Sequence, residues 1–487
     1  MKSSIIISLL IISVFCEDKL FFAFTHFRHG ARAPIFPSEN PVDDYGMTWN
    51  TPGELTAGGH RMHYLLGAYN RKRYIPSLLN DKYDPHEIYV ISSNYNRTIQ
   101  SALSQLQGLY PADETIELNE IQKNYSVPDL QDIDNIQETI TKLGNAALPY
   151  HMRLIGVHIF EEAKMRYRNF ENPKCKQKAL DTMKQNIDND IIVDRLKTFN
   201  EKWSKSFDKF FKDDKAKKYD YETLEKLADL FITDISEGFD FKEFLEKTEL
   251  NDGNLTELYD FFVEFVGRTM NNYQYGDKEH KLIKLDMSSL FKELIEFIKK
   301  RINREADIQE NKKINVQDYS APKLVMVSGH DSMVSVMQLF LGLMYGDRNK
   351  FWHVPGYAAN IAFEVFNTQE NFSRTNYSQY KIRFLFNGTF VEEFQFDEFI
   401  NKVEATAWNE KDIAQFCGYD QEGEKGGDTP TGTTEPEKET NVLAIVLGIT
   451  TGIFFLLCIV FIILWRKKSS TSSTTVENYP LVDKENV

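Results

Sequence analysis

Three strongly apolar runs in the chain predict buried β-strands. They cover residues 19–27, 87–93 and 323–328, and each is short and rich in aliphatic or aromatic side chains. Such runs are typical of strands covered on both faces of a parallel sheet. Polar turns follow each run, and residues 98–109 and 332–343 beyond two of the turns carry apolar residues at helical spacing. The pattern predicts β-to-α units whose polar turns meet at one edge of a sheet.

Between the second and third runs the pattern changes to that of amphipathic helices. From about residue 118 to 315, charged segments repeat apolar residues at three- and four-residue spacing, as in residues 221–233, 239–246, 254–272 and 288–302. This spacing places the apolar residues on one face of a helix. We therefore expect a mostly helical insertion that covers the sheet.

Alternation of apolar and polar residues returns near the end of this region. Residues 361–366 and 380–386 alternate, and Asn387-Gly388 then leads into residues 389–396. An Asn-Gly pair between two such runs is typical of a β-hairpin turn. We expect these strands to extend the sheet.

Together these patterns predict an α/β fold with a mostly parallel central sheet flanked by helices. The α/β core is expected over residues 17–117 and 316–419, and the mostly helical insertion forms a cap over residues 118–315. The two ends of the chain are expected to lie outside this core.

The ends of the chain carry patterns of membrane targeting. Residues 1–16 combine an early lysine with a short apolar run, which predicts a cleaved signal peptide; a buried N-terminal helix is the alternative. Residues 442–465 form an uncharged apolar run followed at once by basic residues. They predict one transmembrane helix with a cytoplasmic tail over residues 466–487. Residues 420–441, rich in Gly, Thr, Pro and charge, are expected to be a solvated stalk.

Composition narrows the class of protein. Of the 487 residues 42% are apolar and 26% are charged, which is ordinary for a globular protein. The net charge of −15 argues against a general nucleic-acid binder, which would normally carry a basic excess. Any phosphate site must therefore be a local basic pocket.

Six Asn-x-Ser/Thr sequences lie on the expected lumenal side of the membrane. We expect Asn96 to be unmodified, because a glycan there would crowd the pocket described below. The other five are predicted glycosylation sites: Asn124, Asn254, Asn371, Asn376 and Asn387.

Two cysteines remain in the lumen under this topology. Cys16 leaves with the signal peptide and Cys458 lies within the span, so Cys175 and Cys417 are left. In an oxidising compartment they suggest one disulfide that closes a long loop, with two free buried thiols as the alternative.

Candidate chemistry lies directly after the first predicted strand. There Arg28, His29 and Arg32 surround Gly30, whose small size allows a tight turn and a close approach to a ligand. Arginines bind phosphate oxygens with paired donors, and a neutral imidazole nitrogen is able to attack phosphorus. A solvated basic loop is the alternative for this segment alone.

The turns after the other two predicted strands supply a further arginine, a histidine and an acid. Arg97 follows the second strand, and the pair His330-Asp331 follows the third. If the strands are parallel, all three turns deliver these charged residues to one edge of the sheet. The shared edge favours an anion site with a nucleophile and an acid over a solvated loop.

With these residues the chain resembles the histidine acid phosphatase family, which includes lysosomal and prostatic acid phosphatases and phytases. The family pattern R-H-G-x-R-x-P, its H-D pair and its downstream arginine are matched by Arg28, His29, Gly30, Arg32, Pro34, His330, Asp331 and Arg97. Leu55-Thr56 with Gly59 is similar to a further family segment, although Met62 stands where the family usually has Gln. The resemblance is strongest to the membrane-bound lysosomal and prostatic types.

The resemblance implies a role for each matched residue. His29 would be the nucleophile that becomes phosphohistidine, and Asp331 would protonate the leaving alcohol. The phosphoryl oxygens would be bound by Arg28, Arg32, Arg97 and His330. Because positive side chains supply the charge stabilisation, neither a metal nor a cofactor is expected.

Three nearby histidines are expected to have structural rather than catalytic positions. His26 belongs to the first strand and is expected in the core or behind the site. His60 and His63 lie in a predicted helix and are expected on its solvated face.

The predicted function is hydrolysis of phosphate monoesters in an acidic lumenal or extracellular compartment. A catalytically inactive phosphate-binding receptor and a phosphomutase-like transferase are the alternatives. The complete set of catalytic positions disfavours the first, and the secretory signals disfavour the second. The choice of phosphomonoester stays open, as does the formation of a homodimer.

The tail carries a candidate sorting signal. Tyr479 and Val482 fit the Tyr-x-x-bulky-apolar pattern that clathrin adaptors bind, and Pro480 favours the extended backbone that such a signal needs. We therefore expect a single-pass type I membrane protein delivered to lysosomes or digestive vacuoles, with residence at the cell surface as the alternative.

Overall fold

A computed structural model describes most of the expected ectodomain. It covers residues 18–35, 51–112, 117–128, 133–159, 173–211, 219–238, 241–315 and 318–418. The predicted signal peptide, stalk, transmembrane helix and sorting signal lie outside these residues. Within the ranges just given, no helix combines the length and apolarity needed to cross a bilayer.

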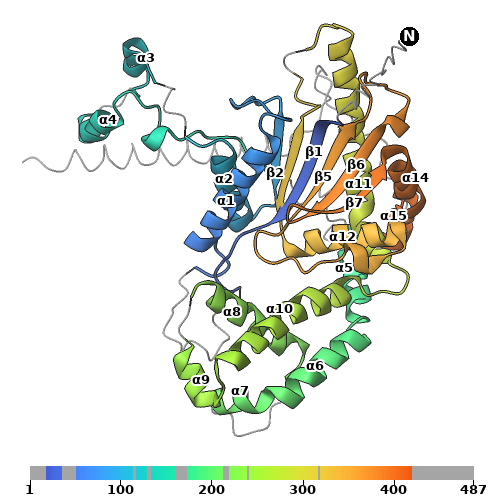
Figure 1. The fold of residues 1–487 in the computed structure, drawn as a ribbon. Coiled ribbons are helices and arrows are strands. Elements are labelled where there is room, and N and C mark those ends of the chain that lie inside the picture. The colour runs from blue at the N-terminus through green and yellow to red at the C-terminus, as the bar shows by residue number, and fades with distance from the viewer. Residues whose placement is uncertain are drawn as a thin grey trace, which may run out of the picture. The chain divides into compact units, whose positions relative to one another are not determined.

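The centre of the fold is a sheet whose described strands run in the order β3-β2-β4-β1-β5-β6-β7 (Figure 1). Strands β3, β2, β4 and β1 are parallel to one another, and β5 to β7 add antiparallel neighbours. The strands span Lys19–Arg28 (β1), Ile88–Ser92 (β2), His158–Ile159 (β3), Leu324–Gly329 (β4), Asn360–Asn367 (β5), Tyr380–Phe386 (β6) and Thr389–Gln395 (β7).

The α/β class is confirmed, and the expectation of a mostly parallel sheet holds in part, because β3, β2, β4 and β1 are parallel whereas β5 to β7 are antiparallel to their neighbours. The sheet is mixed because β5, β6 and β7 follow one another through connections without a long crossover helix, and such neighbours pair in antiparallel fashion. The Asn387-Gly388 turn between β6 and β7 has the positive φ angles, 48° and 76°, that an Asn-Gly hairpin turn requires.

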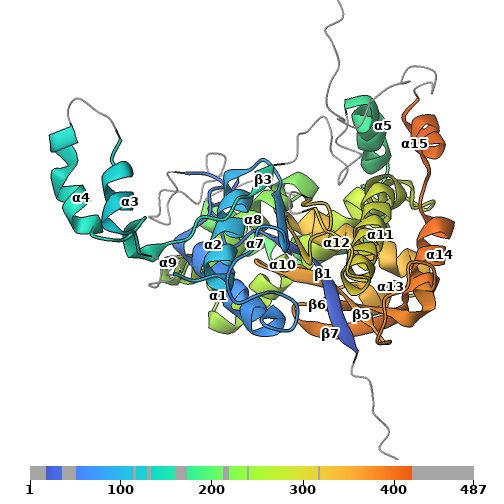
Figure 2. The same ribbon diagram turned by 90° about the horizontal axis from the view of Figure 1, so that it is seen from above.

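Helices cover both faces of the sheet, as Figure 2 shows from above. On one face α1 (Ala57–Tyr74) and α2 (Asn96–Leu109) pack over Ala23 and Phe27. The opposite face is covered by α11 (Lys281–Gln309), α12 (Asp331–Tyr345) and α14 (Phe396–Thr406), which pack over Phe22 and Phe24. Successive β1 side chains thus enter two cores, which explains the unbroken apolar run.

The insertion between β2 and β4 is mostly helical, as expected, and carries its own core. Aromatic side chains from five of its helices meet there: Phe199, Phe207, Phe231, Phe244 and Phe262. Its helices are α3 (Glu120–Tyr125), α4 (Gln137–Leu143), α5 (Pro173–Lys184), α6 (Asp190–Lys202), α7 (Ser204–Phe211), α8 (Tyr221–Ser236), α9 (Lys242–Thr248) and α10 (Asp252–Tyr275), and it ends in α11.

One strand also lies within this insertion. The two-residue β3 pairs with the outer side of β2 and so extends the sheet. A pairing this short has no hydrophobic period of its own, so the sequence pattern could not indicate it.

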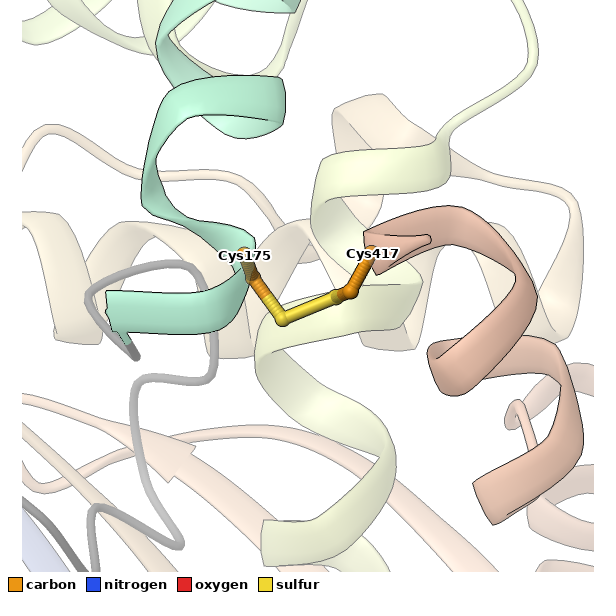
Figure 3. Close-up of a disulfide and its surroundings, with 2 residues drawn as sticks. All are labelled: Cys175 and Cys417. Atoms are coloured by element: carbon orange, nitrogen blue, oxygen red, sulfur yellow. A yellow bond between two sulfur atoms is a disulfide. The ribbon is translucent and has the colours of Figure 1, made fainter. Parts of the chain in front are cut away.

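A disulfide joins Cys175 to Cys417 (Figure 3). Cys175 lies in α5 of the insertion, and Cys417 ends the last described helix, α15 (Glu410–Cys417). The bond links positions 242 residues apart. The prediction of one disulfide is therefore confirmed, and the alternative of two free thiols is not.

Candidate active site

The residues singled out after the three strands come together at one edge of the sheet. β4 lies between β1 and β2, and its last residues pair with Arg28 on one side and Ser92 on the other. His29 and His330 therefore lie side by side, with ring centroids 5.6 Å apart. The His330 Nε2 atom lies 3.1 Å from the Ser93 hydroxyl. The shared edge expected from the sequence is confirmed.

His29 is buried, and its hydrogen bonds orient the ring. Its Nδ1 atom lies 2.8 Å from the carbonyl oxygen of Gly30. A carbonyl only accepts hydrogen bonds, so Nδ1 carries the proton and Nε2 keeps its lone pair. Burial, then the charges of Arg28 and Arg32, hold the pKa of His29 well below its usual range. These neighbours thus favour a neutral imidazole whose Nε2 lone pair is free to react.

Three guanidinium groups surround this imidazole. Arg28 donates to the Pro355 carbonyl at 2.8 Å, and Arg32 donates to the Ala33 carbonyl at 3.0 Å. Arg97 stacks on the ring of Tyr95, with 4.6 Å from guanidinium carbon to ring centroid. In all three side chains the Nε–H group is buried and has no hydrogen-bond partner.

Unsatisfied buried donors are costly, so three at one place indicate a ligand that accepts from them. All three belong to guanidinium groups that charge the pocket positively, and an oxyanion such as phosphate provides several acceptor oxygens. Burial, then the positive charge of the neighbouring Arg32, lower the pKa of Arg97.

Asp331 lies at the start of α12, beside this pocket. One carboxylate oxygen lies 3.1 Å from a guanidinium nitrogen of Arg28, and the other accepts from the backbone N–H of Ser332 at 2.8 Å. Burial alone would raise the pKa of Asp331, but Arg28, His330 and Arg32 outweigh it and lower the pKa. The surrounding protein groups therefore favour the ionised carboxylate.

Only glycine fits at position 30, and the reason is a close contact with Gly59 rather than the expected approach to a ligand. The φ of Gly30 is not positive; a side-chain carbon there would lie 2.5 Å from the carbonyl oxygen of Gly59. Likewise, a side-chain carbon on Gly59 would lie 2.2 Å from the Ala31 carbonyl oxygen. The two glycines let the start of α1 pack directly on the turn that carries His29 and Arg32. The neighbouring Thr56 also bonds to Ala31, which explains why this segment belongs near the pocket.

Helix α8 of the insertion supplies a residue that the sequence analysis did not single out. Asp229 accepts from Arg32 at 2.7 Å and from the backbone N–H of Ile35 at 2.7 Å. Burial opposes the charge on Arg32, but Asp229 outweighs it, so the pKa of Arg32 is raised. An acidic residue on an amphipathic helix has no motif, and only the tertiary contact reveals its role.

Two more contacts tie α8 to the site. Glu237 accepts from the hydroxyl of Thr56 at 2.6 Å, and Thr233 lies 3.2 Å from the hydroxyl of Tyr357. Tyr357 in turn stacks under Arg28, 4.4 Å from ring centroid to guanidinium carbon. The helical insertion therefore forms part of the pocket wall, as a cap would.

The pocket opens into a cavity of about 150 Å³ beside Arg28, Arg32 and Asp331. Its other walls come from α8, α10 and the segment that carries Tyr357. A group attached to a phosphate held by the arginines would enter this cavity.

The structure also shows how exposed the nearby histidines and the asparagines of the glycosylation sequences are. His26 is buried, as expected, and His60 is exposed and lies 2.8 Å from the Ser104 hydroxyl. The prediction of a solvated His63 is wrong, because that side chain is fully buried. Asn96 is exposed beside Glu54, 3.1 Å away. The five predicted glycosylation sites are exposed except Asn254, which is half-buried at the start of α10.

The chain belongs to the histidine phosphatase superfamily, branch 2, whose family model matches residues 19–387. It is 42% identical to prostatic acid phosphatase from Mus musculus over 90 residues, which are 18% of this chain and 23% of that protein. Over 87 residues it is 39% identical to lysosomal acid phosphatase from Xenopus laevis, covering 18% and 20% of the two chains. These matches thus span less than a quarter of each relative.

Among solved structures, the chain is similar to the apo form of Hafnia alvei phytase. The TM-score is 0.48 at 13% sequence identity, and the match covers 82% of this chain and 98% of the phytase.

Proposed function

We propose that the protein is an acid phosphatase that hydrolyses phosphate monoesters through a phosphohistidine formed on His29, without a metal ion. The observation that carries the proposal is the set of three buried Nε–H donors, from Arg28, Arg32 and Arg97, around one neutral imidazole. Phosphoryl transfer depends mainly on positioning and on positive charge around the transferring oxygens, and this pocket supplies both.

In the first step His29 Nε2 attacks phosphorus and the bond from phosphorus to the ester oxygen breaks. The arginines and His330 hold the three remaining phosphoryl oxygens. In the second step a water oxygen attacks the phosphohistidine, the P–N bond breaks, and Asp331 accepts a proton from the water. Asp331 then passes this proton to the departing phosphate, which leaves as the monoanion, so His29 is again neutral, Asp331 is again ionised, and the cycle closes without a further reactant.

The leaving oxygen needs a proton, and an ionised Asp331 does not hold one. A phosphomonoester supplies it, because its second ionisation has a pKa near 6 and the monoanion dominates in acid. We infer that substrate enters as the monoanion and that Asp331 relays this proton to the leaving oxygen. The rate should therefore decline as the pH rises above about 6.

Trapping of the intermediate tests the assignment of His29. Rapid quenching with labelled substrate should leave phosphate on the protein in an acid-labile, base-stable bond, as a phosphoramidate requires. His29→Ala should show no label, whereas the exposed control His60→Ala should show the full amount. Label that survives in His29→Ala would refute the proposal.

We also propose that the enzyme works in lysosomes or digestive vacuoles, held there by its predicted membrane span and sorted through Tyr479. The amino-acid pattern of the tail supports this, and an acidic lumen suits a substrate monoanion. Tyr479→Ala should raise the surface-exposed fraction in antibody labelling of intact cells, with Tyr95→Ala as a lumenal control. Equal surface fractions would favour residence at the cell surface.

A further inference from the structure

The cavity beside the phosphate site has the size of one ring. Its volume of about 150 Å³ matches an apolar cavity that binds benzene. Aliphatic and aromatic side chains form much of its wall, among them Ile232, Tyr259, Val263, Val266 and Val354. The apolar body of a leaving alcohol would fit here while its phosphate contacts Arg28 and Arg32.

One carboxylate in this cavity lacks a partner. Glu225 lies one helical turn before Asp229 on α8, and both line the cavity. Asp229 is engaged by Arg32, whereas Glu225 forms no hydrogen bond or ion pair with any residue in the described part of the chain. A half-buried carboxylate without a partner is unfavourable unless a ligand provides positive charge.

The charges around Glu225 are mostly negative. Asp229 and Glu222 on its own helix and Asp331 on α12 act on it, and Lys226, the cation nearest in sequence, forms an ion pair with Glu222 at 3.2 Å. Burial, then these acidic neighbours, raise the pKa of Glu225 to about 6. Above that pH the cavity presents a net negative charge to the leaving group.

Helix α10 adds a second, independent sign of a polar ligand. Asn271 is 4% exposed and its side-chain nitrogen has no hydrogen-bond partner, although it lines the cavity. Gln274, one turn later, has a buried side-chain oxygen that is also unpartnered. That oxygen and the Glu225 carboxylate are both acceptors for a ligand that carries N–H donors.

We propose that this cavity selects phosphomonoesters whose leaving group joins a ring-sized apolar body to an ammonium group. The apolar walls hold the body, and Glu225 and Gln274 accept from the ammonium. A leaving group with a second phosphate or a carboxylate is disfavoured by Glu225, Asp229 and Asp331. This inference rests on the proposed phosphatase function and names the substrate class of that same site.

Three matched aryl phosphates test the preference. Tyramine phosphate, 4-propylphenyl phosphate and 3-(4-phosphonooxyphenyl)propionate differ at the end of the side chain, which is an ammonium, a methyl or a carboxylate. At pH 7 the wild-type kcat/KM should be highest for the ammonium and lowest for the carboxylate, with about five- to tenfold between ammonium and methyl. The three phenol leaving groups need a proton from Asp331 to a similar extent, so that need largely cancels in the comparison.

The variant Glu225→Gln keeps the shape and removes the charge, so it should reduce the ammonium-to-methyl ratio to about twofold or less. Glu201→Gln is the matched control, because Glu201 is an exposed glutamate of the same insertion that neither lines the cavity nor acts on Glu225. In the wild type the ratio should also increase from pH 5 to 7 as Glu225 ionises, and in Glu225→Gln it should stay flat.

The possible results separate this inference from the proposed function. If all three substrates are hydrolysed at equal rates, or if Glu225→Gln keeps the wild-type ratio, the charge preference is wrong and the phosphatase activity stands. If wild-type protein hydrolyses none of the three nor p-nitrophenyl phosphate, the phosphatase proposal itself fails and the preference fails with it.

Discussion

At the scale of single residues, neighbouring charges affect the pKa of Asp331 more strongly than burial does. A buried carboxyl normally becomes a weaker acid, yet Arg28, His330 and Arg32 together lower the pKa of Asp331. These neighbouring charges therefore favour the ionised carboxylate. In the proposed mechanism this carboxylate relays a proton that the phosphate monoanion brings.

The relay leads to a prediction for Asp331→Asn. This change keeps the shape but removes proton transfer, so turnover of alkyl phosphates should fall by ~10²-fold or more. For p-nitrophenyl phosphate the loss should be much smaller, because its leaving group hardly needs a proton. Steady-state kinetics on both substrates at pH 5 measure the difference, and equal losses would contradict a role in proton transfer.

The residues of the site differ in how far the sequence reveals them. His29, Arg32 and Asp331 are predictable because they stand in a short motif or directly after a strand. Asp229 and Glu225 are not, because they belong to a helix far along the chain whose polar face looks like any solvated face. Their position depends on how the insertion packs on the sheet, which no local pattern determines.

At the scale of elements, α1 shows how close helix packing buries a polar side chain. A side-chain carbon on Gly67 would lie 1.9 Å from the Gln105 carbonyl oxygen of α2, so the two helices contact through their backbones. This approach encloses His63, whose ring lies 5.3 Å from that of Phe27 and whose Nδ1 lies 3.3 Å from Gln105 Oε1. Because polar residues lie near His63 in the sequence, the sequence pattern predicted that its side chain lies on a solvated face of α1.

Burial lowers the pKa of His63 to about 4. An unfolded histidine has a pKa near 6.5, so between these values the unfolded chain binds a proton that the folded protein does not. The free energy of unfolding should therefore fall by about 3 kcal/mol as the pH drops from about 6.5 to 4 through this group alone.

Urea unfolding at a series of pH values measures this effect. His63→Gln should be less dependent on pH in that window, because glutamine does not titrate, and the exposed control His60→Gln should behave as the wild type does. A pH dependence in His63→Gln as steep as that of the wild type would show that other groups cause it.

The element predictions succeeded where a strand or helix has its own hydrophobic period. The apolar runs predicted β1, β2 and β4 to within two residues, and the Asn387-Gly388 turn predicted the β6–β7 hairpin. No local sequence pattern predicts whether β5 runs parallel or antiparallel to β1. That direction depends on the edge of the sheet at which the chain returns. The mixed character of the sheet was therefore beyond the sequence pattern.

At the scale of the whole ectodomain, the disulfide joins the helical insertion to the last helix. Cys175→Ala or Cys417→Ala would free a loop of 242 residues in the unfolded chain. Either change should lower the free energy of unfolding by about 3–5 kcal/mol. Because each single variant already loses the bond, the double variant should unfold at nearly the same urea concentration as the singles, apart from the packing lost with the second sulfur.

Thermal and urea unfolding of the three variants and the wild type test this prediction. Phosphatase activity measured below the unfolding transition is the companion readout, and it should be retained, because neither cysteine lines the active-site cavity. Equal stability of wild type and single variants would show that the bond does not form in the protein as expressed.

The position of β1 in the sheet sets the time at which the enzyme is able to become active. β1 is the first described strand to leave the ribosome, yet it pairs with β4 on one side and β5 on the other, so Ala23 meets Leu324. Synthesis of the roughly 300 residues between them takes about 15 to 60 s at 5–20 residues per second. Throughout that interval the strand before His29 lacks its partners on both edges. A chain that is still being made therefore has no assembled pocket, and the proposed phosphatase activity begins only when translation is nearly complete.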